Sequence, residues 1–439
     1  MADLSRRRFL AVGVAGAALL AGCSDATNPG VPPLPGGGTP TSPTPAQKAT
    51  WRVQGAPLVP STGAGALDGL TVAVTDLFAV AGQQIGAGSP QWLAQAPTEA
   101  GTAEAVARLL GAGATVAGLA QTDDLGYGHS GVNDHYGTPP NVASEALLPG
   151  GSTSGAAAAV AGSAASIGLG ADTGGSVRIP AAYQGLFGFV ASRGAVPTTG
   201  LLPLSPTLDT VGWVTANIDV LEKTVTASVP RTPARELTTA VTAPGLNAIA
   251  TGGALAATTT ALASWRTSDL PTLTDRDFDI AALPDWYDAV TTVVGYEAWK
   301  QHGDFLSGTM SGLSSEAREA FATASRTSEE AYQRARTQLD TAASAVRSYL
   351  GDNVLVLPTT ATPAPAKSDG DLSGETYANT MRSTGMLLSI ATVAGLPTAT
   401  VPLKTADKIP VGLSLVGPAG RDLDLVALAH RVQGSGFVR

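Results

Sequence analysis

The chain has 439 residues, which is enough for one large domain or two ordinary ones with a sizeable buried core. Only 14% of the residues are charged and the net charge is -9, a balance that argues against nucleic acid or an anionic membrane face as a partner. Four histidines and one cysteine form no cluster with metal-ligand spacing, so we predict no metal site and expect no cofactor.

The N-terminus has the features of an export signal. Residues 5–10 contain three consecutive arginines and precede an uncharged run over residues 11–22. The arginines resemble a twin-arginine signal, and residues 20–23 resemble a bacterial lipobox whose cysteine, Cys23, is lipidated. We therefore expect an exported, extracytoplasmic protein that a lipid on Cys23 anchors to the cell membrane, because the apolar run is too short for a comfortable span. An uncleaved anchor and a chance arginine cluster are the alternatives.

Residues 24–50 form a segment rich in Pro, Gly, Ser and Thr with almost no apolar bulk. Such a composition cannot bury enough surface to offset the entropy of ordering, so we predict a flexible tether here. The folded domain is expected to begin near Trp51 and to include residues 51–439.

The first part of this domain alternates strand and helix patterns. Residues 70–74 are a short apolar run typical of a buried strand, residues 101–113 place apolar side chains at helical spacing, and residues 114–119 match the next strand. Two strands joined by a crossover helix pair in parallel, which predicts an α/β sheet.

A glycine-punctuated loop over residues 121–141 comes next and holds Tyr127, His129 and His135. A loop histidine is more often a hydrogen-bonding or surface residue than a catalytic base. His129 and His135 are therefore kept only as alternatives for a base.

Two Gly-Gly-Ser turns follow this loop and place Ser152 and Ser176 24 positions apart. Glycine lets backbone N–H groups face a ligand without a side chain in the way. The alanine-rich residues 156–161 predict a helix with a side-chain cap from residues 152–154, and the apolar residues 166–170 predict a strand. One such turn can simply pack a helix or bind an anion, but the pair is far more specific, because helix and strand return the second serine to the first.

The run from Gly150 to Pro180 resembles the amidase signature family of serine hydrolases. The similarity covers roughly residues 51–432 and is strongest in the signature region, residues 70–212. It looks nearest to the indoleacetamide-hydrolase-like branch and to the amidase-like region of a chloroplast import receptor, and this branch includes proteins without amidase activity. The resemblance implies an α/β amidase-signature fold, a single large domain with a central twisted mixed sheet covered by helices on both faces.

The resemblance also implies a role for the residues of the two turns. Ser176 takes the position of the nucleophile, and Ser152 that of the serine that relays its proton, which family members hold by a cis peptide bond. Backbone N–H groups of Thr173, Gly174 and Gly175 correspond to the oxyanion hole. The residues implied to support this machinery are Ser154, Asp172 and Arg178, and those implied to line the substrate pocket are Tyr127 and His129.

The third member of the family's triad is a lysine at the end of an upstream strand, in a pattern resembling V-A-V-K-D-x-F-x-V-x-G. Residues 72–82 fit this pattern except at the lysine position, which Thr75 occupies. A threonine hydroxyl is essentially non-basic near pH 7, and none of the six lysines lies between the tether and the end of the signature region. We therefore expect the lysine base to be lost.

The second half of the chain shows fewer local signals. Residues 231–284 have weak periodicity and no predicted element, whereas residues 284–350 are helical, with a capping box at residues 327–330. Residues 354–359 match a buried strand. The segments that resemble the family's closing strands and last helix are residues 395–402, 410–417 and 422–432.

Three functions are compatible with these residues. The first is an amidase that hydrolyses the C–N bond of a small carboxamide at Ser176, with its base supplied by a distant lysine, a loop histidine, a water or the substrate's own amine. The second is a catalytically inactive, lipid-anchored binding or scaffold protein for such an amide or acid. The third is a slow esterase, because an alkoxide leaves with less help from an acid than an amine does. General-base catalysis is worth about 10² to 10⁴ in rate, so the absence of a lysine at the position of Thr75 leaves activity open.

Overall fold

The computed structural model describes residues 43–367, 372 and 374–436. The predicted export signal, Cys23 and most of the predicted tether lie outside the described residues. The tether prediction is wrong for residues 45–50, which form a helix. Thr44 caps this helix, Ala49 and Thr50 are buried, and Trp51 follows directly as the start of the first strand. No helix in the described part of the chain is long and apolar enough to cross a membrane.

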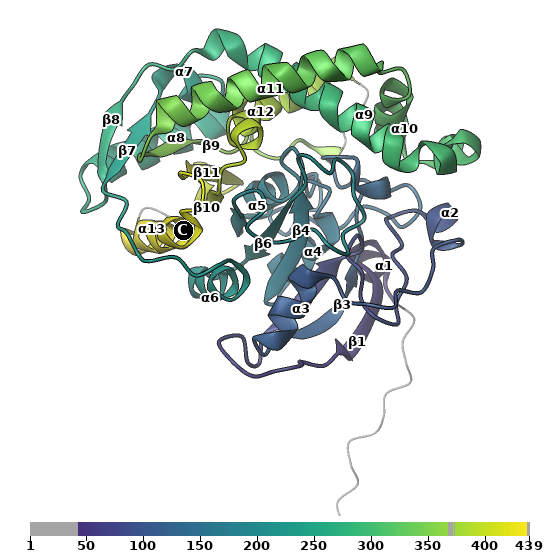
Figure 1. The fold of residues 1–439 in the computed structure, drawn as a ribbon. Coiled ribbons are helices and arrows are strands. Elements are labelled where there is room, and N and C mark those ends of the chain that lie inside the picture. The colour runs from purple at the N-terminus through teal and green to yellow at the C-terminus, as the bar shows by residue number, and fades with distance from the viewer. Residues whose placement is uncertain (1–42, 368–371, 373, 437–439) are drawn as a thin grey trace, which may run out of the picture. The chain divides into compact units, whose positions relative to one another are not determined.

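Eleven strands form one mixed sheet, as the α/β prediction requires (Figure 1). They are β1 (Trp51–Val59), β2 (Thr71–Thr75), β3 (Thr115–Ala120), β4 (Ile167–Asp172), β5 (Phe187–Val190), β6 (Thr210–Thr215), β7 (Thr239–Thr242), β8 (Thr272–Asp275), β9 (Val354–Pro358), β10 (Thr398–Lys404) and β11 (Pro410–Val416). Their order is β1-β3-β2-β4-β6-β5-β10-β11-β9-β7-β8. Strands β3, β2 and β4 are parallel neighbours, and so are β9, β7 and β8, while the other neighbouring pairs are antiparallel.

Thirteen helices pack on and beside the sheet within the described residues. They are α1 (Pro45–Thr50), α2 (Pro90–Leu93), α3 (Glu104–Gly111), α4 (Ser154–Ala161), α5 (Arg178–Gln184), α6 (Ile218–Ser228), α7 (Pro244–Asn247), α8 (Gly252–Arg266), α9 (Leu283–Thr309), α10 (Ser315–Ala324), α11 (Glu329–Leu350), α12 (Glu375–Ala394) and α13 (Asp422–Gly434). Residues 231–284, for which the sequence predicted no element, contain β7, α7, α8 and β8.

Both faces of the sheet are covered by helices. Successive side chains of a strand point to opposite faces, so neighbouring residues of β2 show which helices lie on each face. On β2, Ala73 packs with Ala156 and Ala157 of α4, whereas Val72 and Val74 belong to the main core that includes α3, α6 and α13. The α4 face is made of small residues, so this helix lies close to the strands. The predicted fold, a single α/β domain with helices on both faces of a mixed sheet, is confirmed.

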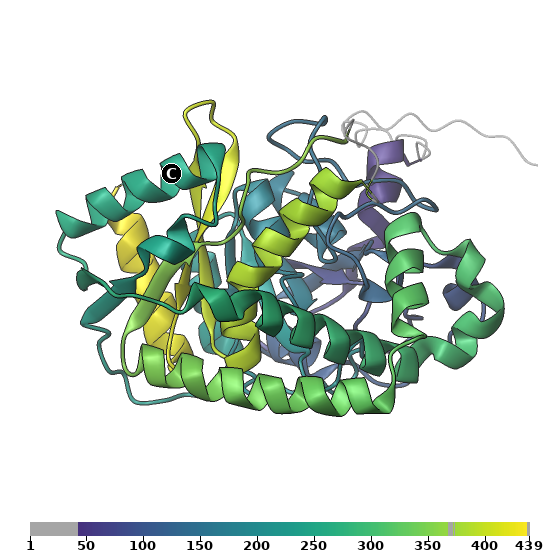
Figure 2. The ribbon, with the colours of Figure 1, turned by 90° about the horizontal axis from the view of Figure 1, so that it is seen from above.

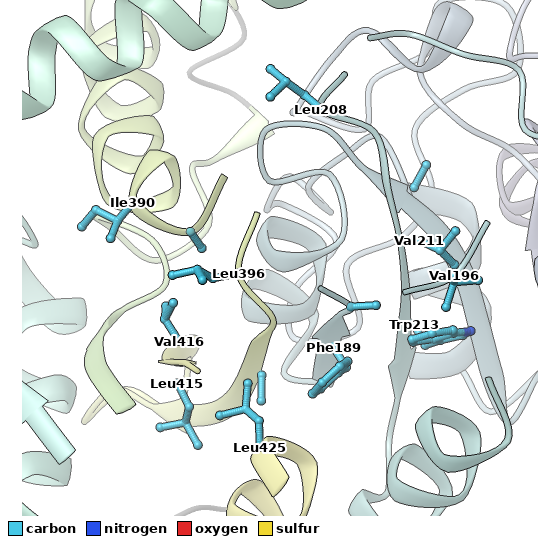
Figure 3. Packing of buried hydrophobic residues seen from close by; sticks show 14 of the residues in the cluster. Phe189, Val196, Leu208, Val211, Trp213, Ile390, Leu396, Leu415, Val416 and Leu425 are labelled. Carbon is cyan, nitrogen blue, oxygen red and sulfur yellow. The ribbon is translucent and has the colours of Figure 1, made fainter. Parts of the chain in front are cut away.

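The main core continues where β5, between β6 and β10, joins the C-terminal strands to the rest of the sheet. Phe189 of β5 lies directly opposite Trp213 of β6 in the antiparallel ladder, and both side chains are fully buried. Figure 3 shows Val196 and Val211 beside Trp213. Aromatic and β-branched neighbours of this kind stabilise a sheet and fix its register.

Four helices form a layer over the edge of the sheet where β2 and β4 end. Helices α9 and α11 lie alongside each other, and α10 and α12 pack against α9 (Figure 2). Helix α11 begins within the segment predicted as a capping box, but the cap is Ser328, whose hydroxyl accepts a hydrogen bond from Ala331 N at 3.2 Å. Because the third helical residue is then Ala331, whose side chain cannot bond back to the cap, the predicted box is not formed. Helices α9, α10 and α12 are called the roof helices below, because they supply one side of the site.

Candidate active site

The site lies where three parallel strands end. Strands β2 and β4 end at Thr75 and Asp172, and β3, on the other side of β2, ends at Ala120. Parallel neighbours deliver their carboxyl ends to the same edge, the usual place for ligands in an α/β sheet. The segment after each strand therefore enters one site, which brings the loop at residues 121–141 and the loop at 173–177 together.

The loop that carries Ser152 precedes α4 and is held from both sides. The Gly151–Ser152 peptide bond is cis, as the resemblance implied, and a Cβ on Gly151 would lie 2.4 Å from Asp123 Oδ2. The Ser152 carbonyl accepts a hydrogen bond from Thr122 Oγ1 at 2.8 Å, and Ser152 is 2% exposed. The predicted side-chain cap is not formed, because α4 begins after Thr153 without a capping hydrogen bond.

A main-chain hydrogen bond joins the two serine loops. The N–H of Thr153 donates to the carbonyl of Ser176 at 3.1 Å. One end of this bond is therefore Ser176 itself, and the other end is the residue that follows Ser152. Ser176 is 4% exposed and Ser154, the first residue of α4, is 1% exposed. The structure thus brings together the two serines that the sequence placed 24 positions apart.

A buried ion pair holds the second loop. Arg178 donates from Nη2 to Asp172 Oδ1 at 2.7 Å and from Nε to Oδ2 at 3.1 Å, and both side chains are almost fully buried. Burial alone would raise the pKa of Asp172, but the Arg178 charge and its hydrogen bonds hold that pKa below its ordinary value. Arg178 also donates to Leu388 O and Thr392 Oγ1, both at 2.9 Å, which ties the loop to α12.

One of the three amides that the resemblance implied for an oxyanion hole is already engaged in a hydrogen bond. The Gly175 N–H donates to Asp172 Oδ1 at 2.8 Å and so points away from a substrate. The amides of Thr173, Gly174 and Ser176 donate no hydrogen bond within the part of the chain that the structure describes. Gly175 has φ +132°, which favours glycine, and this conformation turns its amide toward Asp172. Three unengaged amides beside the nucleophile can still receive a developing oxyanion.

A second carboxyl group, that of Asp209, holds the loop at residues 173–177. Thr173 Oγ1 donates to Asp209 Oδ1 at 2.6 Å, and the amides of Leu204 and Ser205 donate to the same carboxylate. Burial raises the pKa of Asp209 to about 6, against these hydrogen bonds, which lower it. Sequence reasoning missed Asp209, although it precedes β6 at the end of the signature region.

Thr75, at the position of the family's lysine, is fully buried at the end of β2. Its Oγ1 has no hydrogen-bond partner among the described residues. The next residue, Asp76, accepts hydrogen bonds from Arg52 Nε at 2.5 Å and Gly86 N at 3.0 Å, and burial raises its pKa to about 6. Thr75 does not line the small void of about 10 Å³ that lies between Ser152, Thr173 and Asp209, a volume close to what one water needs.

Ser176 opens onto a cavity of about 530 Å³. The predicted lining residues Tyr127 and His129 both line it, together with Thr173 and Gly174. The residues that the roof helices and the turns beside them contribute are Tyr287, Asp288, Val290, Thr291, Thr292, Val294, Gly295, Glu316, Glu319, Ala320, Thr323, Ala324, Thr327, Gly385, Ser389 and Thr392. None of the described residues that line the cavity is a lysine or an arginine.

Glu316 of α10 is a cavity residue that sequence patterns did not predict. Its carboxylate accepts hydrogen bonds from the amides of His129 and Ser130 at 3.0 and 3.2 Å, from Ser130 Oγ at 2.5 Å and from Tyr377 OH at 3.1 Å. It lies 186 residues after Ser130 in the sequence, so no local pattern connects the two.

The two loop histidines have different surroundings. His135 Nε2 lies 3.3 Å from Asp124 Oδ1 and does not line the cavity. His129 lines it, with Nε2 3.9 Å from the position that a Cβ on Gly174 would occupy. Burial lowers the pKa of His129 and raises that of Tyr127, so both side chains are neutral near pH 7.

The fold and the site together define an α/β protein with a serine on a glycine turn beside free amides, which is the arrangement of a serine hydrolase. The chain matches the Amidase family over residues 47–249 and 313–426, and it belongs to that family. It is therefore an amidase-family hydrolase, and amidase-signature structures share its fold.

Named relatives agree with this assignment. The chain is 32% identical to Amidase 1 of Arabidopsis thaliana over 403 residues, which cover 85% of this chain and 94% of the relative. It is 32% identical over 387 residues to the translocon at the outer membrane of chloroplasts 64 of Pisum sativum, and spans 64% of that protein. A solved structure described as that of an amidase superimposes with a TM-score of 0.73 at 28% identity, covering 84% of this chain and 85% of the other.

Proposed function

We propose that the protein hydrolyses the C–N bond of a small carboxamide through an acyl-enzyme on Ser176. The observation that carries this proposal is the position of Ser176 at the cavity, beside the unengaged amides of Thr173 and Gly174. Ser176 Oγ forms a bond to the carbonyl carbon, its proton passes to the leaving nitrogen with Ser152 as relay, and ammonia or an amine departs. Water then cleaves the acyl–Oγ bond and restores the Ser176 hydroxyl.

The charge of the cavity indicates which carboxamides fit. Glu316 and Glu319 line it, and the third carboxylate, Asp288, is paired with Arg382 at 2.6 Å. Because none of the described lining residues is cationic, an anionic substrate would lose its hydration and meet like charge, whereas a neutral or cationic substrate meets no such repulsion. We therefore propose a neutral or positively charged amide as the substrate class.

Labelling and turnover test this function on the purified chain. A fluorophosphonate probe is expected to label wild type and not Ser176→Ala, and turnover of an amide panel should vanish in that variant. Within a size-matched set, the cationic amide should be cleaved with higher kcat/KM than its carboxylate analogue. Absence of both labelling and turnover across amides and esters contradicts the proposal.

A second candidate is favoured by the absence of a lysine at Thr75. In this candidate function the protein is lipid-anchored and its cavity binds an amide or acid without cleaving it. The lipid on Cys23 and the export of the protein are predictions from the sequence alone. The variant Thr75→Lys separates the candidates. If it raises amide hydrolysis by about 10² to 10⁴, the range that general-base catalysis supplies, the remaining machinery is intact. If ligands stabilise the protein and neither wild type nor Thr75→Lys turns over, the binding function holds.

A slow esterase is the third candidate, since an ester needs less acid assistance than an amide. It predicts that a nitrophenyl ester is cleaved far faster than the matched anilide. Near-equal rates on the two substrates contradict it.

A further inference from the structure

His129 occupies a place at the cavity that makes its ring available for proton transfer. Its main chain is fixed on two sides, because its carbonyl accepts a hydrogen bond from Gly151 N at 2.8 Å and its N–H donates to Glu316 Oε1 at 3.0 Å. The residue is thus anchored to the Ser152 loop and to α10 at the same time. Its ring Nε2 lies 3.9 Å from the Cβ position of Gly174, whose amide is one of the free donors beside Ser176.

The ring itself makes no hydrogen bond within the part of the chain that the structure describes. The residue is half-buried and its ring nitrogens are not among the buried atoms that lack a partner, so they are accessible from the cavity. The other three histidines do not line the cavity, and each has a polar group beside its ring: His135 Nε2 lies 3.3 Å from Asp124 Oδ1, His302 Nε2 donates to Pro203 O at 2.8 Å, and His430 lies beside Asp219 and Glu222.

The protonation state of His129 suits an acceptor. Burial is the main cause that lowers its pKa, the charge of Arg178 on α5 acts in the same direction, and Glu316 on α10 and Asp172 on β4 oppose it. The lowered pKa leaves the imidazole neutral near pH 7, with a free lone pair.

The other titratable groups at the cavity are less suited to accept a proton. Glu316 already accepts four hydrogen bonds and Asp288 is paired with Arg382. The pKa values of Tyr127 and Tyr287 are raised by burial, so both remain phenols. Glu319 is exposed on α10. Of the described residues that line the cavity, His129 alone has a basic nitrogen.

We propose that His129 is the general base that takes the place of the missing lysine, acting from the cavity side of Ser176. This inference rests on the proposed amidohydrolase function. As the Oγ–C bond forms, the Ser176 proton moves directly to the imidazole, in place of the route through Ser152, and the imidazolium then gives it to the leaving nitrogen as the C–N bond breaks. In the second half, the imidazole takes a proton from the attacking water, and this proton returns to Ser176 as the acyl–Oγ bond breaks.

The first test compares His129→Gln with wild type on an amide that wild type cleaves. We expect kcat to fall by about 10² to 10⁴ with little change in KM, because a base is lost while the hydrogen-bonding shape is kept. His430→Gln, an exposed histidine on α13, is the matched control and should equal wild type. A rise in KM alone would assign His129 to substrate binding and overturn the proposal.

Chemical rescue gives a readout that a structural role would not move. Added imidazole should restore part of the activity of His129→Ala and leave wild type unchanged. The acidic limb of the wild-type kcat/KM profile should lie below pH 6.5 and disappear in His129→Ala. In the Thr75→Lys background, loss of His129 should cost much less than in wild type, since the lysine supplies the base.

The outcomes separate this inference from the function on which it rests. If wild type is labelled at Ser176 and turns over while His129→Gln matches it and imidazole has no effect on His129→Ala, the base assignment is wrong and the amidohydrolase stands. If wild type shows neither labelling nor turnover, the function fails and the base assignment fails with it.

Discussion

The Thr75 hydroxyl lowers the stability of the folded state, because it is buried at the end of β2 without a hydrogen-bond partner among the described residues. Leaving a polar group dry and unpaired costs about 1–3 kcal/mol relative to pairing it. Thr122, one strand away, has a buried hydroxyl that donates to Ser152 O at 2.8 Å, so the same group is satisfied there.

This contrast predicts opposite effects of two isosteric substitutions. Thr75→Val should leave the free energy of unfolding unchanged or raise it by about 1 kcal/mol, because it removes an unpaired group. Thr122→Val should lower it by about 1–2 kcal/mol, because it leaves the Ser152 carbonyl without its donor. Urea denaturation of both variants measures the difference. Equal destabilisation by the two would show that the Thr75 hydroxyl is paired in solution, for example by a water.

At the scale of elements, the site depends on close contact between α4 and the sheet. A Cβ on Gly168 of β4 would lie 2.7 Å from Val214 Cγ2 and 3.1 Å from Ala156 O. The alanines of α4 and the glycines of β4 thus let the helix lie near the strands, which keeps the Ser152 loop beside the end of β4. Any added volume between them has to be accommodated by moving the helix or the strand.

We predict that Gly168→Ala destabilises the protein by about 1–3 kcal/mol through overpacking. Gly111→Ala is the control, because a Cβ there has no heavy atom within 4 Å and the residue is helical. That change should be neutral or stabilising by up to about 1 kcal/mol. The midpoint of thermal unfolding should therefore fall for Gly168→Ala and stay the same or rise for Gly111→Ala. An equal fall of the midpoint in both variants would contradict close packing at α4.

At the scale of the whole molecule, the roof helices are tied to the signature region by buried polar contacts. The Nε2–H of His302 on α9 donates a hydrogen bond to Pro203 O at 2.8 Å, and its ring packs edge-on against Trp92 with centroids 5.6 Å apart. Burial lowers the pKa of His302 to about 4. Folding therefore requires this ring to stay neutral under conditions where the unfolded chain would protonate it.

The sign of the resulting pH dependence follows from proton binding. Between pH 6.5 and about 4 the unfolded state binds the proton and the native state does not, so stability is lost as pH falls through this range. Relative to His302→Gln, wild type should lose about 2 kcal/mol between pH 7 and pH 5. The comparison with the variant is needed because Asp76 and Asp209, with raised pKa values, favour the native state in the acidic part of the range. Chemical denaturation at the two pH values measures it, and parallel changes in both proteins would contradict a buried, neutral His302.

The sequence predicted those parts of the structure whose cause is local. The glycine pairs and the alanine run at residues 150–176 dictate turn, helix, strand and turn by backbone preference alone, and the structure has α4 and β4 at these places. Strands β7 and β8 were missed because each has only four residues and β8 buries a single side chain, so neither produces a clear pattern.

Two features of the site depend on contacts that no local pattern reports. The Gly175 amide is engaged because the Asp172 carboxylate, held by Arg178, lies within reach of it. Glu316 reaches the site only because α10 folds back over the loop at residues 129–130. Both follow from tertiary arrangement, which a single sequence does not display.

The division of the cavity between two stretches of chain bears on how such proteins acquire new substrates. The two serines and the free amides beside them belong to residues 150–178, whereas Val290, Thr291, Ala320 and Thr323 line the cavity from α9 and α10. Mutations in these helices can enlarge, narrow or recharge the space without changing Ser176 or these amides. Selection can therefore explore substrate range in one stretch while the chemistry is inherited unchanged in the other, and chimaeras that exchange α9 and α10 between relatives should exchange preference as well.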